Sequence, residues 1–268
     1  MEYGQALLHR RNRTCEHSRR MGSPYMRYEI YCAYHSNVDP EAYGDQFDRP
    51  IFVKLGNDST LAEVPRCLDL QSFRTFRRLG KEYAETEMLL NLYWADMAEL
   101  WKPPDYVGFV HYDMSWRGAE RPAMTVSDYL DHCQLGAKKA VAFQPYDGGF
   151  ILQQPGIEWV MELSRLLYAT TSGTLLNRPH LGRARVSMCN AFVVHQSVFR
   201  RLCKVLSAIY ESKELARCDV SDRIAGGVLE RVAALHLFAE GLELIEFPLS
   251  HGFVASHLQD NRLTGEKS

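Results

Sequence analysis

Three polar residues, His111, Tyr112 and Asp113, directly follow the short apolar run Tyr106–Val110. A run of this kind is typical of a strand that is covered on both faces in an α/β sheet. Because side chains alternate along an extended chain, His111 and Asp113 are expected to point the same way at the carboxyl edge of the sheet, where open α/β folds bind ligands. This edge is the best candidate for a functional site, unless both side chains only cap the strand and bond to the backbone.

A carboxylate also falls inside an apolar helical stripe just upstream. Six residues recur at steps of four and three and so predict one face of a helix over residues 81–101: Tyr83, Glu87, Leu90, Trp94, Met97 and Trp101. Glu87 could bind a ribose or orient a phosphate-binding group, or it could pair with a buried arginine.

Strands and helices are expected to alternate along the rest of the chain. The patterns predict strands over residues 28–34, 51–55 and 140–144, and helices over residues 125–135 and 156–171. This alternation indicates an α/β fold with a largely parallel sheet.

Residues 186–194 are predicted to form one further strand, in which Asn190 is the single polar member. A buried asparagine needs a hydrogen-bond partner, either the backbone or a ligand. Ser197 and Ser221 are expected to cap the two helices that follow. The second helix contains Gly226-Gly227, which costs about 1 kcal/mol per glycine relative to alanine and would be explained by the close approach of a sugar or a strand.

Four segments together resemble a known family. They are Tyr28–His35, the Glu87 helix leading into His111-Tyr112, Asn190–Val194, and Asp222–Arg231. In order and spacing they resemble the bacterial glycosyltransferase-like proteins of capsular polysaccharide biosynthesis, over residues 26–253. Where that family has His-Tyr-Arg-Arg-Tyr-Phe, this chain has Asp113-Met114 after His-Tyr, so the roles of those arginines cannot be transferred.

The resemblance implies a GT-A-like fold, with a Rossmann-type, mostly parallel sheet flanked by helices. Residues 26–268 would form one domain, with a nucleotide-binding half over about 26–145 and an acceptor half over about 146–268. The implied activity moves a sugar from a nucleoside-diphosphate-sugar to a glycan, a lipid-linked acceptor or another hydroxyl. Two other hypotheses stay open: the acceptor is modified DNA, or the chain is a catalytically inactive nucleotide-sugar-binding protein.

The resemblance also implies a divalent cation, Mn²⁺ or Mg²⁺, that neutralises the leaving diphosphate. Asp113 would be its oxygen ligand, with His111 and His251 completing the shell because imidazole suits Mn²⁺. Tyr34 could stack on the base and His35 donate to a phosphate or ribose oxygen, or the two are an ordinary surface pair at a strand end. The residues expected to contact the nucleotide sugar are Tyr34, His35, Glu87, Asn190 and Arg223.

Two acids are candidates for activating the acceptor hydroxyl. Asp222 lies in the first turn of its predicted helix and would be the general base of an inverting enzyme. Its charge could equally do no more than complement the helix N-terminus. Glu230, two turns further on, is the other candidate base, and Arg223 could neutralise the diphosphate.

The composition is that of an ordinary globular protein. The 268 residues are 46% hydrophobic and 24% charged, and no uncharged apolar run of 18 residues occurs. The N-terminus lacks the apolar segment of a secretory signal. The seven cysteines contain no C-x-x-C pair, which argues against a zinc site or a disulfide framework. We expect a cytoplasmic protein without a transmembrane segment, at most peripheral at the inner membrane surface.

Residues 1–25 contain five arginines and two glutamates, a net charge of +3 in a chain whose total is −2. Such an arm could contact nucleic acid or an anionic membrane. It could also be a disordered tail, or the coding start could lie at Met21 or Met26.

Overall fold

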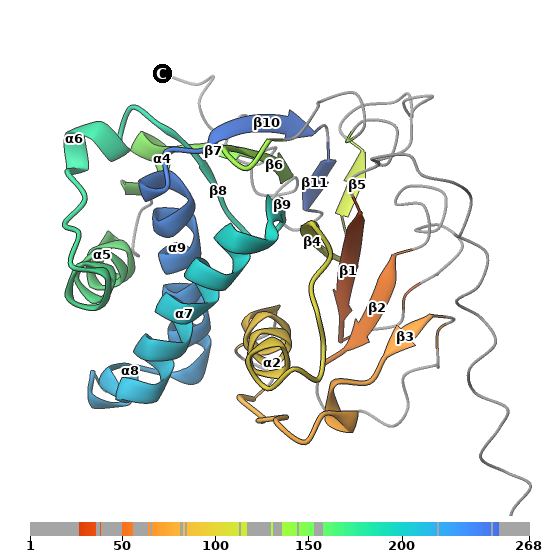
Figure 1. Cartoon of the computed structure of the whole chain (residues 1–268). Coiled ribbons are helices and arrows are strands. Elements are labelled where there is room, and N and C mark those ends of the chain that lie inside the picture. Colours follow the sequence, from red (N-terminus) through yellow and green to blue (C-terminus); the bar gives the residue numbers. More distant parts are fainter. Residues whose placement is uncertain are drawn as a thin grey trace, which may run out of the picture.

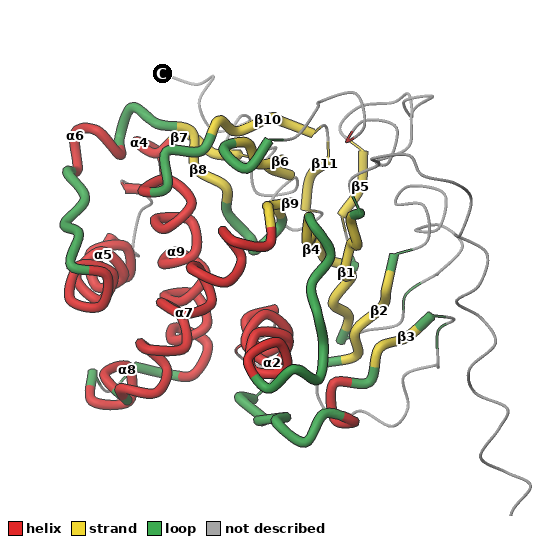
Figure 2. The backbone as a smooth tube through the Cα atoms, viewed as in Figure 1, coloured by secondary structure: helices red, strands yellow, loops and turns green. Residues whose placement is uncertain are grey.

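The computed structural model describes residues 27–35, 38, 50–55, 64, 66–80, 83, 85–112, 114–116, 130, 136–143, 145–152, 158–218, 220–247 and 249–251. Figure 1 shows these residues as a mixed α/β fold, and Figure 2 shows the same view by type of secondary structure. None of the described helices is long and apolar enough to cross a membrane. The basic arm, residues 1–25, lies outside the described residues.

The described strands include a central sheet of seven, with the order β10-β6-β9-β4-β1-β2-β3. Its members are β1 (Tyr28–Tyr34), β2 (Ile51–Lys54), β3 (Cys67–Leu68), β4 (Tyr106–His111), β6 (Lys139–Phe143), β9 (Phe192–His195) and β10 (Glu243–Phe247). Two small antiparallel pairs flank it: β5 (Met114–Trp116) with β11 (Leu249–His251), and β7 (Pro145–Asp147) with β8 (Arg185–Ser187).

The central sheet is mostly parallel, as the alternation of strands and helices predicts. Only β9 is reversed, because it pairs antiparallel with both β4 and β6, whereas the other described pairs are parallel. The strand therefore begins at the edge where its two neighbours end. It also joins the predicted halves in one sheet, since β9 comes from the second half and lies between two strands of the first.

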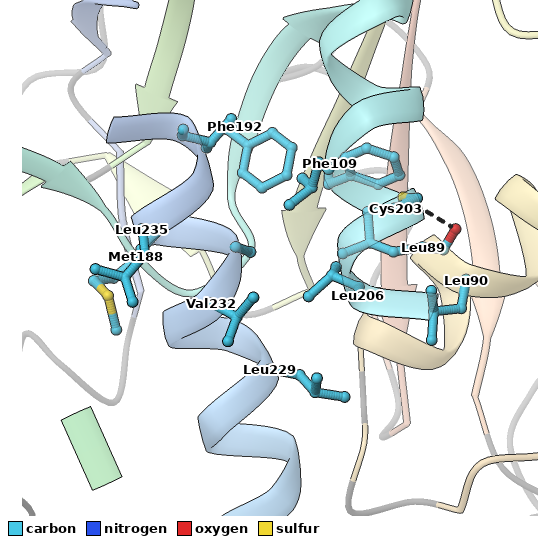
Figure 3. Packing of buried hydrophobic residues seen from close by; sticks show 14 of the residues in the cluster. Leu89, Leu90, Phe109, Met188, Phe192, Cys203, Leu206, Leu229, Val232 and Leu235 are labelled. Atoms are coloured by element: carbon cyan, nitrogen blue, oxygen red, sulfur yellow. Dashed lines mark hydrogen bonds between the residues drawn. The ribbon is translucent and has the colours of Figure 1, made fainter. Parts of the chain in front are cut away.

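Helices cover one face of the sheet (Figure 1). The long ones are α2 (Glu85–Met97), α5 (Glu158–Ser172), α7 (Gln196–Ser212) and α9 (Asp222–Ala239), and the short ones are η1 (Leu70–Ser72), α4 (Gly148–Leu152), α6 (Arg178–Leu181) and α8 (Glu214–Arg217). Figure 3 shows how α2, α7 and α9 meet the sheet: Leu89, Leu206 and Val232 pack beside Phe109 and Phe192. Burying such aliphatic and aromatic side chains stabilises each by about 1.5–3 kcal/mol.

A second apolar cluster lies on the opposite face. Alternate residues of β1 divide between the two cores, so that Tyr31 and Ala33 face the helices while Cys32 and Tyr34 face the other side. The second cluster also includes Met114 of β5 and Leu130. Leu130 is the only described residue of the helix predicted over 125–135.

Helix α2 is shorter than predicted and is buried on nearly all sides. It begins at Glu85 and ends at Met97, where the chain turns through Glu99 with a φ of 58°. Apart from the half-buried Tyr93, every residue from Glu85 to Asp96 is buried, whereas Met97, predicted on the apolar face, is 58% exposed. The prediction of one apolar stripe was wrong because the sheet, α7 and residues 73–80 together surround the helix.

The strand predicted over residues 186–194 is in fact two strands. Cys189 and Asn190 have φ values of 63° and 46°, a left-handed conformation that interrupts extended backbone. As a result β8 pairs outside the central sheet with β7, and β9 enters it. A smaller correction concerns α7, which is capped by His195, whose ring accepts from the Ser197 N–H, and not by Ser197.

Candidate functional site

A buried pair of opposite charges lies where β4 ends and α2 begins. Glu85 Oε1 is 3.0 Å from His111 Nδ1, and both side chains are about one-tenth exposed. Because α2 precedes β4 and runs back along it, its first turn lies at the carboxyl edge of the sheet. Burial alone would raise the pKa of Glu85. The charge of His111 and its hydrogen bond outweigh this effect, so the pKa of Glu85 is below its usual value.

His111 bonds to an acceptor on each side of its ring. Nδ1 faces the Glu85 carboxylate, and Nε2 contacts the carbonyl oxygen of Cys189. A carboxylate and a carbonyl are both acceptors, so the imidazole lies between two acceptors that fix the plane of its ring.

The backbone of Cys189 links this pair to α9. Its N–H donates to Glu230 Oε1 at 2.8 Å, while its carbonyl accepts from His111. Burial, together with the negative charges of Glu230 and Glu85, raises the pKa of the Cys189 thiol well above its usual value. The thiol stays protonated, and Cys189 therefore serves through its backbone and not as a nucleophile.

Asn190, the next residue, carries an unsatisfied polar atom. Its side chain is 5% exposed, and its Oδ1 has no hydrogen-bond partner among the described residues. Buried polar atoms without partners are rare in native proteins, so this amide is available to a ligand. The residue lies at the carboxyl edge, because Phe192 pairs with Phe109 and Ala191 accepts from the Phe143 N–H.

Two aromatic side chains stand at the ends of β1 and β4. The ring of His35, which is exposed, lies edge-on to the ring of Tyr112 with the centroids 5.1 Å apart. Tyr34, by contrast, is 1% exposed and packs against Phe52 in the second core. A base cannot reach the ring of Tyr34 in this arrangement, whereas His35 and Tyr112 are accessible.

Glu87 holds a loop. Its Oε2 accepts from the N–H groups of Leu79 and Gly80 at 2.8 and 3.1 Å. Asn91, one turn further along α2, bonds to both the N–H and the C=O of Arg77. These contacts fix residues 77–80 against the helix and do not include the Glu85–His111 pair.

Helix α9 turns one of the predicted residues, Glu230, toward Cys189. Asp222 and Arg223 are the first two residues of the helix, and the structure describes their backbone but not their side chains. The Glu230 carboxylate already accepts a hydrogen bond from the Cys189 N–H. A close contact explains Gly227, the second glycine of the Gly226-Gly227 pair. A Cβ added there would lie 3.2 Å from Arg231 Nη1, which donates to the Gly227 carbonyl.

The predicted metal ligands are only partly described. Asp113 and the side chain of His251 lie outside the described residues. The backbone of His251 pairs with Met114, the residue after Asp113, so strand pairing brings these two segments together. No group of three or more potential ligands occurs among the side chains that the structure describes, and the third predicted ligand, His111, is engaged there by Glu85 and the Cys189 carbonyl.

The structure thus unites His111, Asn190 and Glu230 around Cys189, with His35 at the rim, and leaves Glu87 and Tyr34 elsewhere. Sequence reasoning missed Glu85 and Tyr112. The signal for Glu85 is an acid at the start of a helix that precedes a strand ending in a histidine. It lies two residues before Glu87, the predicted site residue. Tyr112 lies inside the candidate motif, and its position at a strand end beside His35 is the signal that marks it.

A comparison with solved structures finds the same fold in a glycosyltransferase. The apo structure of WbbM, described as a bifunctional glycosyltransferase, superposes with a TM-score of 0.52 and 15% sequence identity, over 84% of this chain and 45% of that one. This chain thus spans less than half the length of that protein. No protein-family model and no curated protein matches the sequence. The likeness shows that the α/β fold described above is a Rossmann-like glycosyltransferase fold.

Proposed function

We propose that this chain is a glycosyltransferase that moves a sugar from a nucleoside-diphosphate-sugar to a hydroxyl acceptor at the carboxyl edge of the central sheet. The observation that carries the proposal is the buried chain of contacts from Glu85 through His111 and Cys189 to Glu230. It lies at the edge where this class of fold binds ligands. The likeness in fold to a glycosyltransferase supports the same activity.

Each part of the edge has a separate task in this proposal. The accessible rings of His35 and Tyr112 contact the nucleotide. The Glu85–His111 pair fixes the end of β4 and, through the Cys189 carbonyl, the position of Asn190. Asn190 Oδ1, which has no partner among the residues that the structure describes, accepts a hydrogen bond from a hydroxyl of the donor sugar.

The acceptor hydroxyl is activated by Asp222 in our proposal. Glu230 is less suited to the role of general base, because it already accepts a hydrogen bond from the Cys189 backbone. Asp222 begins the same helix two turns earlier, and Arg223 beside it is the cation for the leaving diphosphate. A base in this position contributes about a hundredfold or more to the rate.

A divalent cation would be held by Asp113, with His251 as the second protein ligand, and His111 would support them as a positioning residue. When bound, the ion would neutralise charge on the diphosphate. The test is to measure turnover in excess chelator and again after Mn²⁺ is restored. Full activity in chelator would remove the cation from the proposal.

The transferase activity is tested by incubating the full chain with a panel of UDP- and GDP-sugars, with Mn²⁺ and with glycan or lipid-linked acceptors, and measuring nucleoside diphosphate release. We expect release from one donor, and a loss of about a hundredfold in Asp222→Asn. Glu243→Gln, an exposed acid on β10, is the matched control and should leave the rate unchanged.

Two outcomes would contradict the proposal. Binding of a nucleotide sugar without release, across all acceptors, would indicate a binding protein that has lost catalysis. A normal rate in Asp222→Asn would exclude that residue as the base. Replacing His35 by alanine should raise the donor KM with little change in kcat, because a nucleotide contact distant from the reacting atoms contributes uniform binding.

A further inference from the structure

A pocket lies between α5, α7 and α9, on the helical side of the molecule. It is a groove of about 450 Å³, lined by the end of α5, the middle of α7 and the last turn of α9. None of the residues assigned above to the sheet edge lines it. The groove is therefore a separate feature that the proposed transfer reaction does not use.

A buried histidine faces this groove without a hydrogen-bond partner. His236 is 6% exposed, and its Nδ1 has no partner among the described residues. Its Nε2 is 3.2 Å from Glu240 Oε1, but the geometry is not that of a hydrogen bond. Burial lowers the pKa of His236 despite the nearby carboxylate, so the neutral ring offers one donor and one acceptor.

The charges around the groove do not cancel. Arg201 is fully engaged with Glu240 through two hydrogen bonds of 2.7 and 2.6 Å. Lys204, one turn along α7, is exposed and forms no ion pair within the part of the chain that the structure describes. One positive charge is therefore left at the rim of the groove.

The remaining lining alternates polar and apolar groups. Hydroxyl groups come from the end of α5 and the turn after it, while the floor is aliphatic, with Tyr168 edge-on to His236 at a centroid distance of 6.0 Å. The residues concerned are Tyr168, Thr171, Ser172, Thr174, Val205 and Ala208. The Ser172 hydroxyl already accepts from the Thr174 N–H, which leaves the threonine hydroxyls for a ligand. Hydroxyls that both donate and accept, beside an apolar surface, are complementary to a sugar ring, which has hydroxyls at its rim and C–H groups on its faces.

We propose that this groove binds an anionic sugar, a single pyranose ring that carries one carboxylate or phosphate. The ring hydroxyls pair with His236 and the threonine hydroxyls, and the negative group pairs with Lys204. The groove, at about 450 Å³, is large enough for such a ligand, and a ligand with both features satisfies the unpaired imidazole and the unbalanced charge. The proposal stands independently of the activity at the sheet edge.

The experiment is a calorimetric titration of the full chain with glucuronate, glucose 6-phosphate, glucose and inorganic phosphate. We expect at least one anionic sugar to bind at least about tenfold more tightly than both glucose and phosphate. Which anionic sugar binds more tightly identifies the charged group. Lys204→Ala should weaken its binding about tenfold, and Lys102→Ala, an exposed lysine outside the groove, should not.

His236 is tested by two variants, because a change at a buried position can disturb the fold. His236→Phe removes both ring nitrogens and His236→Asn keeps a donor and an acceptor, so the first should lose binding and the second should retain part of it, with unchanged circular dichroism. Equal binding of phosphate and glucose 6-phosphate would overturn the assignment of a sugar. Absence of binding, or unaltered binding in Lys204→Ala, would overturn the site.

Discussion

Two regions beside α2 each depend on one buried carboxylate, and they use it differently. At the sheet edge, Glu85 faces the charged ring of His111. At the loop 77–80, Glu87 accepts from two backbone N–H groups. The first carboxylate is balanced by a full opposite charge and the second by amide dipoles.

This difference separates the consequences of losing each group. Without Glu85 a buried cation loses its counter-charge, which is among the more costly events inside a protein. Without the charge on Glu87, two amides lose a strong acceptor but no ion is left unpaired. Two acids in the same turn of one helix thus differ in role, and neither residue type nor burial alone distinguishes them.

The largest expected effect is that of Glu85→Gln. We expect it to lower the free energy of unfolding by about 3 kcal/mol, because buried His111 loses the carboxylate that balances its charge. Urea unfolding at pH 7 measures the loss, with Glu99→Gln, an exposed acid beyond the end of the same helix, as the control. A change below about 0.5 kcal/mol would mean that the pair is not coupled in the folded chain.

The same pair predicts a dependence on acid. The folded state holds the pKa of Glu85 below its ordinary value of 4.5, so the unfolded chain takes up the proton first as pH falls. The stability that Glu85 contributes is therefore complete above pH 4.5 and is lost as pH falls through the lower, folded pKa. Unfolding curves from pH 7 to pH 3 should show wild type approaching Glu85→Gln, and a constant gap would contradict this.

Glu87→Gln should have a smaller and more local effect. The amide keeps an oxygen acceptor but loses the charge, at a cost of about 1–2 kcal/mol. Hydrogen exchange gives the sharper measurement: the N–H groups of Leu79 and Gly80 should exchange about tenfold faster in this variant. In Glu85→Gln the exchange of these two N–H groups relative to global unfolding should not change. Equal acceleration in both variants would show that the two regions are coupled.

The smallest effect on stability is expected at Asn190. Asn190→Gly should change the free energy of unfolding by less than about 0.5 kcal/mol, because glycine accepts the left-handed backbone and Oδ1 has no partner to lose within the described part of the chain. Asn190→Ala should cost about 1 kcal/mol from the backbone alone. If the amide binds the donor sugar, Asn190→Gly should still weaken nucleotide-sugar binding about tenfold in a thermal-shift titration.

The sequence predicts the scaffold well where the signal is local. The apolar run before His111 places that residue at a strand end, and alternation of strands and helices predicts the mostly parallel sheet. The break at Cys189-Asn190 could not be predicted, since neither residue type requires left-handed backbone. It is imposed by the reversed strand, which must enter the sheet at the edge where its neighbours end.

Partners across the fold were also beyond the reach of local patterns. Glu85 and Glu87 are equivalent by type, and only the position of His111 at the sheet edge distinguishes them. Tyr34 and His35 are adjacent, yet the pleat sends the first into a core and leaves the second accessible. The groove at His236 is lined by three helices that are separated in sequence, so no local motif predicts it.

The position of β9 has a consequence for how the protein is made. Strands β1 to β4 can pair as soon as residues up to 111 are available, but β6 has β9 and β10 as its neighbours in the sheet. The apolar segment 139–143 therefore has no strand partner in the central sheet until residues 192–195 and 243–247 have been synthesised. Such late, long-range pairing slows folding and exposes the intermediate to aggregation, so expression at low temperature or with chaperones should favour the native yield.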